Sequence, residues 1–374
     1  MLRFIQSHRH LIILALLGLV ASCNKNKPKD PTDTFDKTAL LTQIGGQLAL
    51  PAYASLAQAT DTLAEKYALF ATQKDMSSLK ALQAQFLRCY VLFQEVSVYD
   101  LGPAETELFR ANANTFPCDT AQILSKIQNG DFQLNTAADI DAKGFPALDF
   151  LLFDVHNSDA FILQRFTSSP QATNYLAYLE ALIGEIKLKS NTIAAAWSAS
   201  GNNYLSTFIS NTGSNTGGSI GMLVNQFCYD LEVLKNASIA IPAGKRSLGV
   251  LYPEKCEGYF SKSSLTLAKA RFQALRNLYM GNSKTGTGIG FDDYLTHLNA
   301  VYGNQSLHQT IVNKFDDAQL ALQDIPESLA ESVSNQSAKV DKAYAELQQL
   351  VVLLKVDMTS VLGVQITYQD NDGD

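Results

Sequence analysis

Apolar residues recur every three or four positions along most of the chain. Between residues 76 and 100 the regularly spaced apolar side chains are Leu79, Leu82, Phe86, Cys89, Phe93 and Val96. The same spacing returns in the segments 170–199, 307–322 and 340–361. This period places the apolar side chains on one face of a helix, which can then pack into the core of a bundle. The sequence therefore predicts an all-α fold of amphipathic helices.

Segments rich in glycine, asparagine, serine and threonine interrupt these helices. One covers Ser210–Ser219 and another covers Gly281–Gly290. The first leaves room for several helices on either side. We therefore expect two packed halves, each resembling a four-helix bundle, at residues 37–210 and 218–365. Strand-like alternation is scarce, and Val364–Tyr368 is the one short candidate for a strand.

A carboxylate falls on the last apolar stripe. The spacing that begins at Val340 and reaches Leu354 places Asp357 at the next core position. An unpaired buried charge costs on the order of several kcal/mol, so this placement is unfavourable. We expect the stripe to shift to Met358, or the carboxylate to pair locally, in preference to a ligand-binding role for Asp357.

The N-terminal residues have the pattern of an export signal. A basic start precedes the apolar run Leu11–Val20, which is too short to cross a bilayer because a spanning helix needs roughly 20 residues. Val20-Ala-Ser-Cys23 follows at once and is typical of a bacterial lipobox. We expect residues 1–22 to be a lipoprotein signal peptide, Cys23 to carry the lipid anchor, and residues 23–36 to form a flexible tether. The alternative is an ordinary cleaved signal with an incidental cysteine.

The composition narrows the classes of function. Hydrophobic residues make up 46% of the chain and charged residues 17%, so a large core can form and global disorder is excluded. The net charge is −7 and no basic stripe is present, which argues against a nucleic-acid partner. Residues 366–374 form an acidic tail that lacks the bidentate glutamate of a calcium loop. We expect a protein of the cell envelope, lipid-anchored to the outer membrane on its periplasmic or its surface side.

Cysteines beyond the predicted anchor are widely scattered and form no CxxC pair. The compartment outside the inner membrane permits disulfides. Disulfide bridges in any pairing and buried apolar thiols are therefore both open. The residues concerned are Cys89, Cys118, Cys228 and Cys256.

Stretches of the chain also share the order and spacing of a known family. The first three are Phe93–Glu105, Thr115–Ile123 and Gly144–Asp154. Together they resemble the imelysin-like family, also catalogued as M75 peptidases. The resemblance continues through Leu223–Asn225, Lys235–Pro242 and Pro253–Glu257, and so covers nearly all of the chain beyond its predicted signal. It implies two helical bundles that meet at a cleft, export or lipid anchoring, and a link to iron acquisition.

The signature of that family is Gly-x-His-x-x-Glu, and this chain departs from it. The matching residues are Gly144, Pro146 and Asp149, which gives G-x-P-x-x-D. In the family motif the histidine and glutamate stand three apart on one helix face, where both can reach one metal ion. Pro146 has no donor or acceptor side chain, and Asp149 is one methylene shorter than glutamate. The departure argues against transition-metal binding through the motif and against metal-assisted hydrolysis.

The variant motif still has a physical role to fill. Pro146 suits the first turn of a helix, and Asp149 then lies near the positive end of the helix dipole. Glu95 lies one residue off the apolar stripe, and a partly buried carboxylate needs a partner. We predict that Glu95 and Asp149 converge with Glu105 or Glu257 at the cleft between the halves. This cluster would either bind a polar ligand or cation, or cap helices and pin the halves together.

Three functions follow from these features. The leading one is a non-catalytic binding lipoprotein of the cell envelope, linked to the uptake of iron or another nutrient and working with a small-molecule or metal ligand and an envelope protein partner. The alternatives are an M75-like metallopeptidase and a structural or adhesion module at the surface. The residues expected at the ligand site are Glu95, Ser97, Glu105, Gly144, Pro146, Asp149, Glu257 and Ser261, with Asp149 and Glu95 as the best candidates to hold iron or another cation.

Overall fold

Helices form nearly all of the regular structure, which confirms the all-α prediction. The computed structural model describes residues 34–155, 158–326 and 328–368. From Asp36 onward the chain forms one compact unit.

Several sequence predictions lie outside the described residues. They concern the signal peptide 1–22, the anchor Cys23, all but the last residues of the tether 23–36, and the acidic tail from residue 369 onward. Among the residues that the structure describes, no helix has the length and apolar character needed to cross a bilayer. The membrane predictions therefore stay predictions.

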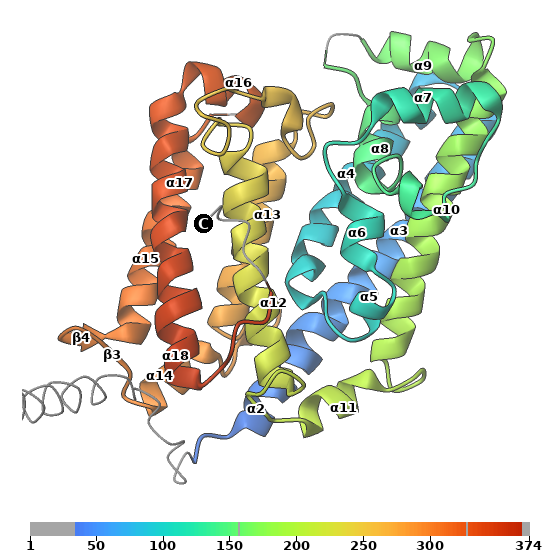
Figure 1. Ribbon diagram of the computed structural model, residues 1–374. Coiled ribbons are helices and arrows are strands. Elements are labelled where there is room, and N and C mark those ends of the chain that lie inside the picture. Colours follow the sequence, from blue (N-terminus) through green and yellow to red (C-terminus); the bar gives the residue numbers. More distant parts are fainter. Residues whose placement is uncertain (1–33, 156–157, 327, 369–374) are drawn as a thin grey trace, which may run out of the picture. The chain divides into compact units, whose positions relative to one another are not determined.

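Three long helices dominate the first part of the unit, coloured blue to green in Figure 1. They are α3 (Leu50–Gln73), α4 (Met76–Val96) and α10 (Ala172–Trp197), and α3 packs along both of the others. Asp75 starts α4, because its side chain accepts the backbone N–H of Ser78. Shorter helices surround them: α2 (Lys37–Thr42), α5 (Pro103–Thr106), α6 (Phe109–Asn114), α7 (Thr120–Asn129), α8 (Gly144–Leu152), α9 (Asp159–Thr167) and α11 (Tyr204–Ser210). We call these helices the first group.

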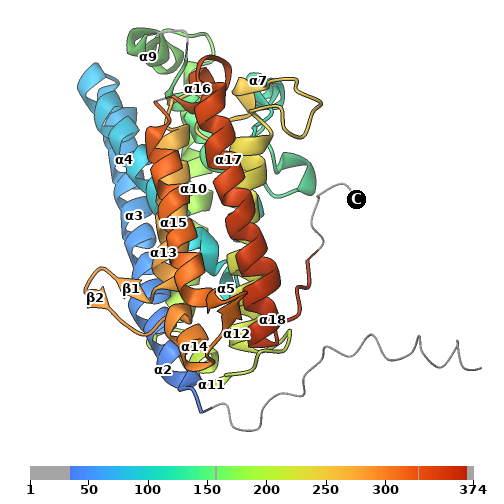
Figure 2. The ribbon, with the colours of Figure 1, turned by 90° about the vertical axis from the view of Figure 1, so that its left-hand side faces the viewer.

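The second group follows in yellow to red in Figure 1. Its long helices are α12 (Ser219–Val233), α13 (Ser264–Tyr279), α15 (Leu307–Asp324) and α17 (Ser337–Val352). α15 and α17 lie side by side, as both Figure 1 and Figure 2 show. The short helices α14 (Phe291–His297), α16 (Leu329–Asn335) and α18 (Thr359–Leu362) complete the group. α13 packs against α4, so the two groups meet along these helices.

The segment between α11 and α12 separates the two groups in the sequence. α11 ends at Ser210 and α12 begins at Ser219, as the glycine- and asparagine-rich composition of this segment predicted. The two halves at 37–210 and 218–365, each resembling a four-helix bundle, stay a prediction. From Asp36 onward the chain clusters as one compact unit.

Strands are confined, in the described residues, to two small hairpins. β1 (Asn282–Ser283) pairs with β2 (Gly286–Thr287), and β3 (Val301–Tyr302) pairs with β4 (Gln305–Ser306). The strand expected at 364–368 is absent, so that prediction was wrong. The reason is that a side chain satisfies this backbone: Asn225 on α12 donates to the Gln365 carbonyl at 2.9 Å and accepts the Thr367 N–H at 2.8 Å.

Wide π-helical turns interrupt three of the helical runs. They are η1 (Gln43–Ala49), η4 (Leu234–Ala240) and η6 (Leu353–Met358), and tighter 3-10 turns form η2 (Ser97–Tyr99), η3 (Ala137–Asp139) and η5 (Pro253–Lys255). A π turn adds a residue to the helix and so rotates the buried face. At η6 this rotation buries Met358 completely and leaves Asp357 partly exposed. The predicted shift of the apolar stripe to Met358 is confirmed.

The cysteines that follow the predicted anchor are all free thiols. Cys89, Cys228 and Cys256 are buried, and Cys118 is partly exposed. Burial raises the pKa of the Cys256 thiol to about 12, which keeps it protonated and unreactive at neutral pH. Of the two interpretations left open by the sequence, the disulfide bridges are absent among these four cysteines, and three of the four thiols are buried.

Candidate functional site

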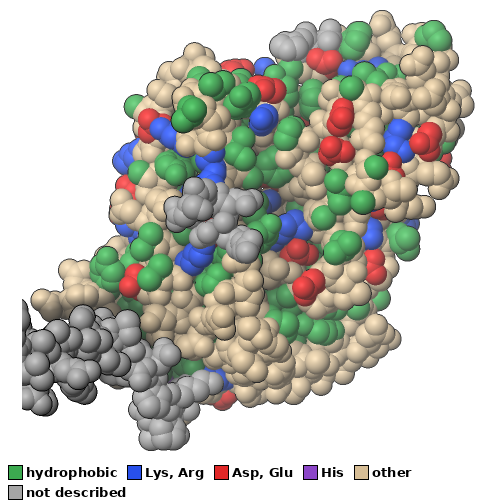
Figure 3. Space-filling model, in the orientation of Figure 1, with side chains coloured by type: hydrophobic (Ala, Val, Ile, Leu, Met, Phe, Trp, Pro, Cys, Tyr) green, Lys and Arg blue, Asp and Glu red, His purple; other side chains and the backbone are tan. Residues whose placement is uncertain are grey.

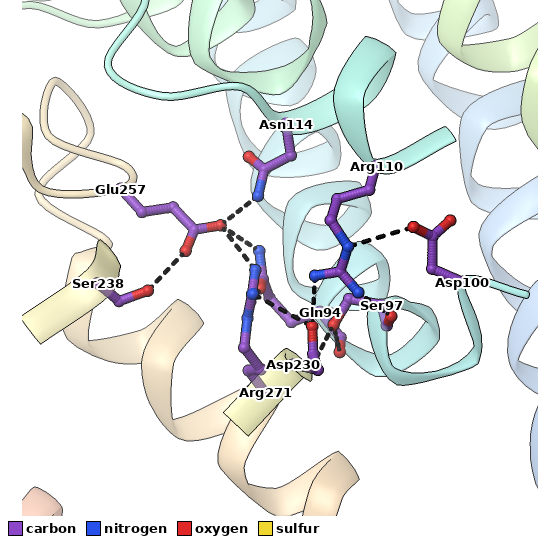
Figure 4. Close-up of polar contacts among 9 residues, drawn as sticks. All are labelled: Gln94, Ser97, Asp100, Arg110, Asn114, Asp230, Ser238, Glu257 and Arg271. Carbon is purple, nitrogen blue, oxygen red and sulfur yellow. Dashed lines mark hydrogen bonds and ion pairs between the residues drawn. The ribbon is translucent and has the colours of Figure 1, made fainter. Parts of the chain in front are cut away.

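A network of charged and polar side chains fills the boundary between the two groups of helices (Figure 4). From the second group come Asp230 on α12, Arg271 on α13 and Glu257 in the loop after η5, and none of them is more than 2% exposed. The first group contributes Gln94, Ser97, Asp100, Arg110 and Asn114. Charges buried this deeply are stable only when they are paired and hydrogen-bonded, so each group completes the other.

Arg271 lies at the centre of this network. Its Nε donates to Gln94 Oε1 at 2.8 Å. Its two terminal nitrogens reach Asp230 Oδ1 at 3.3 Å and Glu257 Oε1 at 3.5 Å. One guanidinium from α13 thus joins an amide on α4 to two carboxylates of its own group.

Glu257 also connects the two groups of helices through its carboxylate. Oε1 accepts the Nε2 donor of Gln94 and the Nδ2 donor of Asn114, both at 2.7 Å. Oε2 accepts the hydroxyl of Ser238 on η4 at 3.3 Å. Side chains from both groups therefore satisfy this buried acid.

Arg110 on α6 approaches Asp230 from the first group. Its NH1 donates to Asp230 Oδ1 at 2.5 Å, and its Nε donates to Asp100 Oδ2 at 3.2 Å. The guanidinium carbon lies 5.2 Å from the ring centroid of Tyr229, over the ring face. Burial by itself lowers the pKa of Arg110, but Asp230 and Asp100 outweigh burial and raise that pKa above its ordinary value. Arg110 therefore stays charged.

Asp100 keeps an unused acceptor in this network. Its Oδ1 is buried, and no donor in the described part of the chain reaches it. Burial raises the pKa of Asp100, Arg110 lowers it in part, and the nearby Asp230 raises it again. An oxygen in this position is suited to accept an N–H or O–H from a ligand.

A pocket of about 420 Å³ opens beside the network, and we call it the interface pocket. Its lining includes Asp100, Glu105, Arg110, Asn114, Tyr229 and Arg271. Figure 3 shows acidic and basic side chains close together along this boundary. The lining thus carries two arginines, an asparagine and two carboxylates, which is the composition of a site for a polar molecule.

Asp149 lies elsewhere on the boundary and has different partners. It is 1% exposed on α8. Its Oδ2 accepts the backbone N–H of Phe260 at 2.9 Å, and its Oδ1 accepts that of Ser261 at 3.1 Å. Burial raises the pKa of Asp149 to about 7, against the opposing effect of the hydrogen bonds from Ser261 and Phe260. Asp149 thus fastens α8 of the first group to a loop of the second.

Gly144 and Pro146 set the position of that helix. Gly144 has a φ of +75°, and a Cβ added there would lie 2.3 Å from the carbonyl oxygen of Ala113. Only glycine fits this position, since both the backbone angle and the space exclude a side chain. Pro146 is buried in the first turn of α8, and its carbonyl accepts the thiol of Cys118 at 3.4 Å.

The variant motif does not fit a metal ion. A cavity of about 20 Å³ beside Asp149, lined also by Pro146, Cys118 and Cys256, has room for about one water molecule. Both oxygens of Asp149 already accept backbone hydrogens, and Pro146 offers no side-chain ligand. Across the described residues, no group of three or more His, Cys, Asp or Glu side chains could hold a metal ion.

The remaining predicted site residues are divided between these places. Ser97 and Glu257 belong to the network, where Ser97 Oγ donates to Asp230 Oδ2 at 3.0 Å. Glu105 is exposed and lines the interface pocket. Glu95 lines a different pocket and pairs with Lys284 at 3.0 Å. The structure therefore brings Glu257 into the network and keeps Asp149 at the boundary, but it places Glu95 apart from both.

Among the charged residues of the network, sequence reasoning missed Arg110, Asp230 and Arg271. A signal was present for one of them. Arg271 follows the buried Leu267 and Ala268 on α13 at helical spacing, so a cation occupies an apolar stripe. A charge on such a stripe predicts a buried partner.

Comparisons with known proteins give the same architecture. A family model described as imelysin, Peptidase M75, matches residues 49–354. A solved structure described as an iron-regulated protein A precursor from Parabacteroides distasonis aligns with a TM-score of 0.73 at 15% identity, over 87% of this chain and 95% of that chain. An imelysin-like protein from Psychrobacter arcticum aligns with a TM-score of 0.66 at 17% identity, over 89% of this chain and 97% of that chain. No curated protein matches the chain. The structural likenesses establish a shared fold.

Proposed function

This chain belongs to the imelysin family, and from that premise we propose that it is a non-catalytic binding lipoprotein of the cell envelope that takes part in the uptake of iron or another nutrient. The family match and the lipobox before Cys23 support the proposal. The similar fold of a protein described as iron-regulated favours iron as the nutrient.

The state of the family motif supports a role without catalysis. A metallopeptidase needs a metal that activates water or polarises a carbonyl. Here Pro146 replaces the histidine, and Asp149 uses both oxygens to hold the backbone of Phe260 and Ser261. The motif thus contributes to the joint between the groups, and binding falls to the interface pocket.

The single observation that carries the proposal is the placement of Arg110 and Arg271 at the interface pocket. Both guanidiniums line the pocket while the network holds them in place. Guanidinium groups recognise carboxylates and similar anions in a bidentate way. The unsatisfied Asp100 Oδ1 adds an acceptor for a hydroxyl group. We therefore propose that iron arrives already complexed by a hydroxycarboxylate chelator and that the protein contacts the chelator.

Titration of the full chain with ferric citrate tests this proposal. Calorimetry should detect binding, and the melting temperature should rise, because a ligand that binds only the folded state stabilises it. Arg110→Gln should weaken binding at least tenfold, because it removes a charged donor from the pocket. Arg246→Gln, an exposed arginine outside the pocket lining, is the matched control and should leave binding unchanged.

Two outcomes would contradict parts of this proposal. If ferric citrate and haem both leave the melting temperature and the absorption spectrum unchanged, the link to iron fails. If citrate without iron binds as tightly as ferric citrate, the nutrient is the carboxylate and iron is incidental.

Attachment to the membrane through Cys23 is a further part of the proposal. The lipobox predicts that acyl chains on Cys23 hold the protein in the membrane fraction. Cys23→Ser should therefore move the protein to the soluble fraction and abolish incorporation of radiolabelled palmitate. Cys89→Ser, which alters a buried thiol, is the control and should stay in the membrane fraction.

A further inference from the structure

A second pocket lies on another side of the boundary, and we call it the hairpin pocket. It has a volume of about 240 Å³ and is enclosed by η1, α3, the end of α4, α13 and the β1–β2 hairpin. Figure 2 shows this hairpin beside α3 and α13. The hairpin pocket shares none of its lining residues with the interface pocket. Ala270 and Arg271 are neighbours in the chain but line different pockets, so the polar network lies between the two.

We call the alanine-rich part of the lining of the hairpin pocket its floor. It comprises Leu48, Pro51, Ala52, Ala270 and Ala274, three of them alanines, and the rest of the lining is largely polar. Because alanine side chains end at Cβ, the space above them remains open. An apolar group that fills this space is removed from water, which favours binding.

The lining of the pocket includes one acid and one base, which come from different elements. Glu95 comes from α4 and Lys284 from the turn between β1 and β2, and they pair at 3.0 Å. The Glu95 side chain is 31% exposed and the Lys284 side chain 68% exposed. A pair this accessible to water contributes little to stability, so a ligand can separate it at low cost.

An unsatisfied acceptor lies in the same wall as Lys284. Asn282 on β1 lines the pocket, and its side-chain oxygen is buried without a donor from the described residues. A buried acceptor without a partner is unfavourable, and a ligand N–H would relieve it. This observation points to a ligand that carries a donor.

From these contacts we propose that the hairpin pocket binds a small zwitterion with an apolar tail, of which an apolar α-amino acid is the simplest example. The ligand's ammonium group forms an ion pair with Glu95 and donates a hydrogen bond to the Asn282 side-chain oxygen. Its carboxylate forms an ion pair with Lys284, and its side chain packs on the alanine-rich floor. A zwitterion makes an ion pair with both Glu95 and Lys284, whereas a ligand with only one charge makes one of these contacts, so the zwitterion is favoured. This site is independent of the proposed function at the interface pocket.

Calorimetric titration of the full chain with L-leucine tests the inference. Two matched ligands dissect the head group: 4-methylpentanoate lacks the ammonium, and 3-methylbutylamine lacks the carboxylate. Leucine should bind, and each analogue should bind at least tenfold more weakly, because each loses a charged hydrogen bond. If both analogues bind as tightly as leucine, the pocket recognises only the tail and the inference is overturned. Absence of binding for both leucine and phenylalanine at millimolar concentration would overturn it as well.

Substitutions in the lining of the hairpin pocket test whether leucine binds there. Glu95→Gln and Lys284→Gln should each weaken leucine binding at least tenfold without altering the circular dichroism spectrum, since both side chains reach solvent. Ala274→Leu should abolish binding by filling the floor. Lys339→Gln, which breaks another solvent-accessible ion pair, is the matched control. Unchanged binding in both charge variants would show that leucine binds elsewhere.

A variant in the interface pocket tests whether leucine binds there instead of in the hairpin pocket. Glu105→Gln alters an exposed residue that lines the interface pocket and not the hairpin pocket, so it should preserve the fold and leave leucine binding within twofold. Loss of leucine binding in this variant would assign the amino acid to the interface pocket and overturn the inference. Failure of ferric citrate to bind would leave it standing, so the two proposals fail separately.

Discussion

Asp149 and Glu257 are both buried carboxylates at the boundary between the two groups of helices, but they are satisfied in opposite ways. Asp149 accepts backbone N–H groups of Phe260 and Ser261. Glu257 accepts side-chain donors, with Gln94 and Asn114 both at 2.7 Å. Backbone donors are fixed by the course of the loop, whereas side-chain donors can turn toward a ligand. Asp149 thus belongs to a structural joint at α8, whereas Glu257 belongs to the region around Arg271 in which we propose binding.

The residues of this chain that match the family motif, Gly144, Pro146 and Asp149, all lie on α8. The residues that match the motif lie at the joint, and the arginines that line the interface pocket lie outside the motif. The lining of the interface pocket includes residues of α6, α12 and α13 and none of α8. The following predictions test this division.

Removal of Arg271 should have the largest effect. Arg271→Met leaves Asp230 and Glu257 buried with less compensation, and breaking a buried ion pair costs about 3–5 kcal/mol of unfolding free energy. Urea unfolding monitored by circular dichroism measures the loss. Lys339→Met is the control, because its exposed pair with Asp324 should contribute less than about 1 kcal/mol. A loss at Arg271 as small as that of the control would show that water already screens the network.

A dependence of stability on pH should follow from Asp149. Burial raises its pKa to about 7 in the folded protein, whereas the pKa of an aspartate in the unfolded chain is about 3.9, so between these values the folded state holds a proton that the unfolded state releases. The free energy of unfolding should therefore fall as the pH rises from about 4 to about 7 and level off above that, by as much as about 4 kcal/mol. Urea midpoints at pH 5 and pH 8 measure the difference.

The variant Asp149→Asn assigns this pH dependence. Burial also raises the pKa of Asp292, to about 6, so a smaller slope of the same sign should remain in the variant. If Asp149→Asn retains the full slope, the joint does not titrate and the carboxylate stays ionised throughout.

Restoring the motif histidine should have the smallest effect. Pro146→His supplies an imidazole, but both oxygens of Asp149 already accept backbone hydrogens, and the adjacent cavity is only about 20 Å³. We expect no measurable affinity for Zn²⁺ or Fe²⁺ by calorimetry. A gain of metal affinity in this variant would show that Asp149 can leave the backbone N–H groups of Phe260 and Ser261 to bind a metal ion. The joint could then act as a binding site as well.

Local patterns predicted the helices well, because apolar spacing depends only on neighbours along the chain. The shift from Asp357 to Met358 could be anticipated in the same way, since a buried charge is unfavourable wherever the helix packs. The strand expected at 364–368 failed because Asn225, far away in the sequence, binds that backbone. Contacts of this kind depend on docking between helices, which spacing alone does not specify.

The candidate site was predictable only in part for the same reason. The sequence left Asp149 with two roles, and the structure places it in the arrangement that pins the groups together. Glu95 was expected to be partly buried and to need a partner, and it is, but the partner Lys284 lies 189 residues further along the chain. Arg110 and Arg271 meet Asp230 only after α4, α6, α12 and α13 have assembled, so no local pattern could place them together.

Gly144 matches the family signature, whereas Pro146 and Asp149 do not. Position 144 is where α8 passes the carbonyl of Ala113, with no room for even one methyl group. Any side chain at position 144 would push α8 away from Ala113 and carry Asp149 away from the backbone N–H groups of Phe260 and Ser261, so the joint depends on a residue that makes none of its hydrogen bonds.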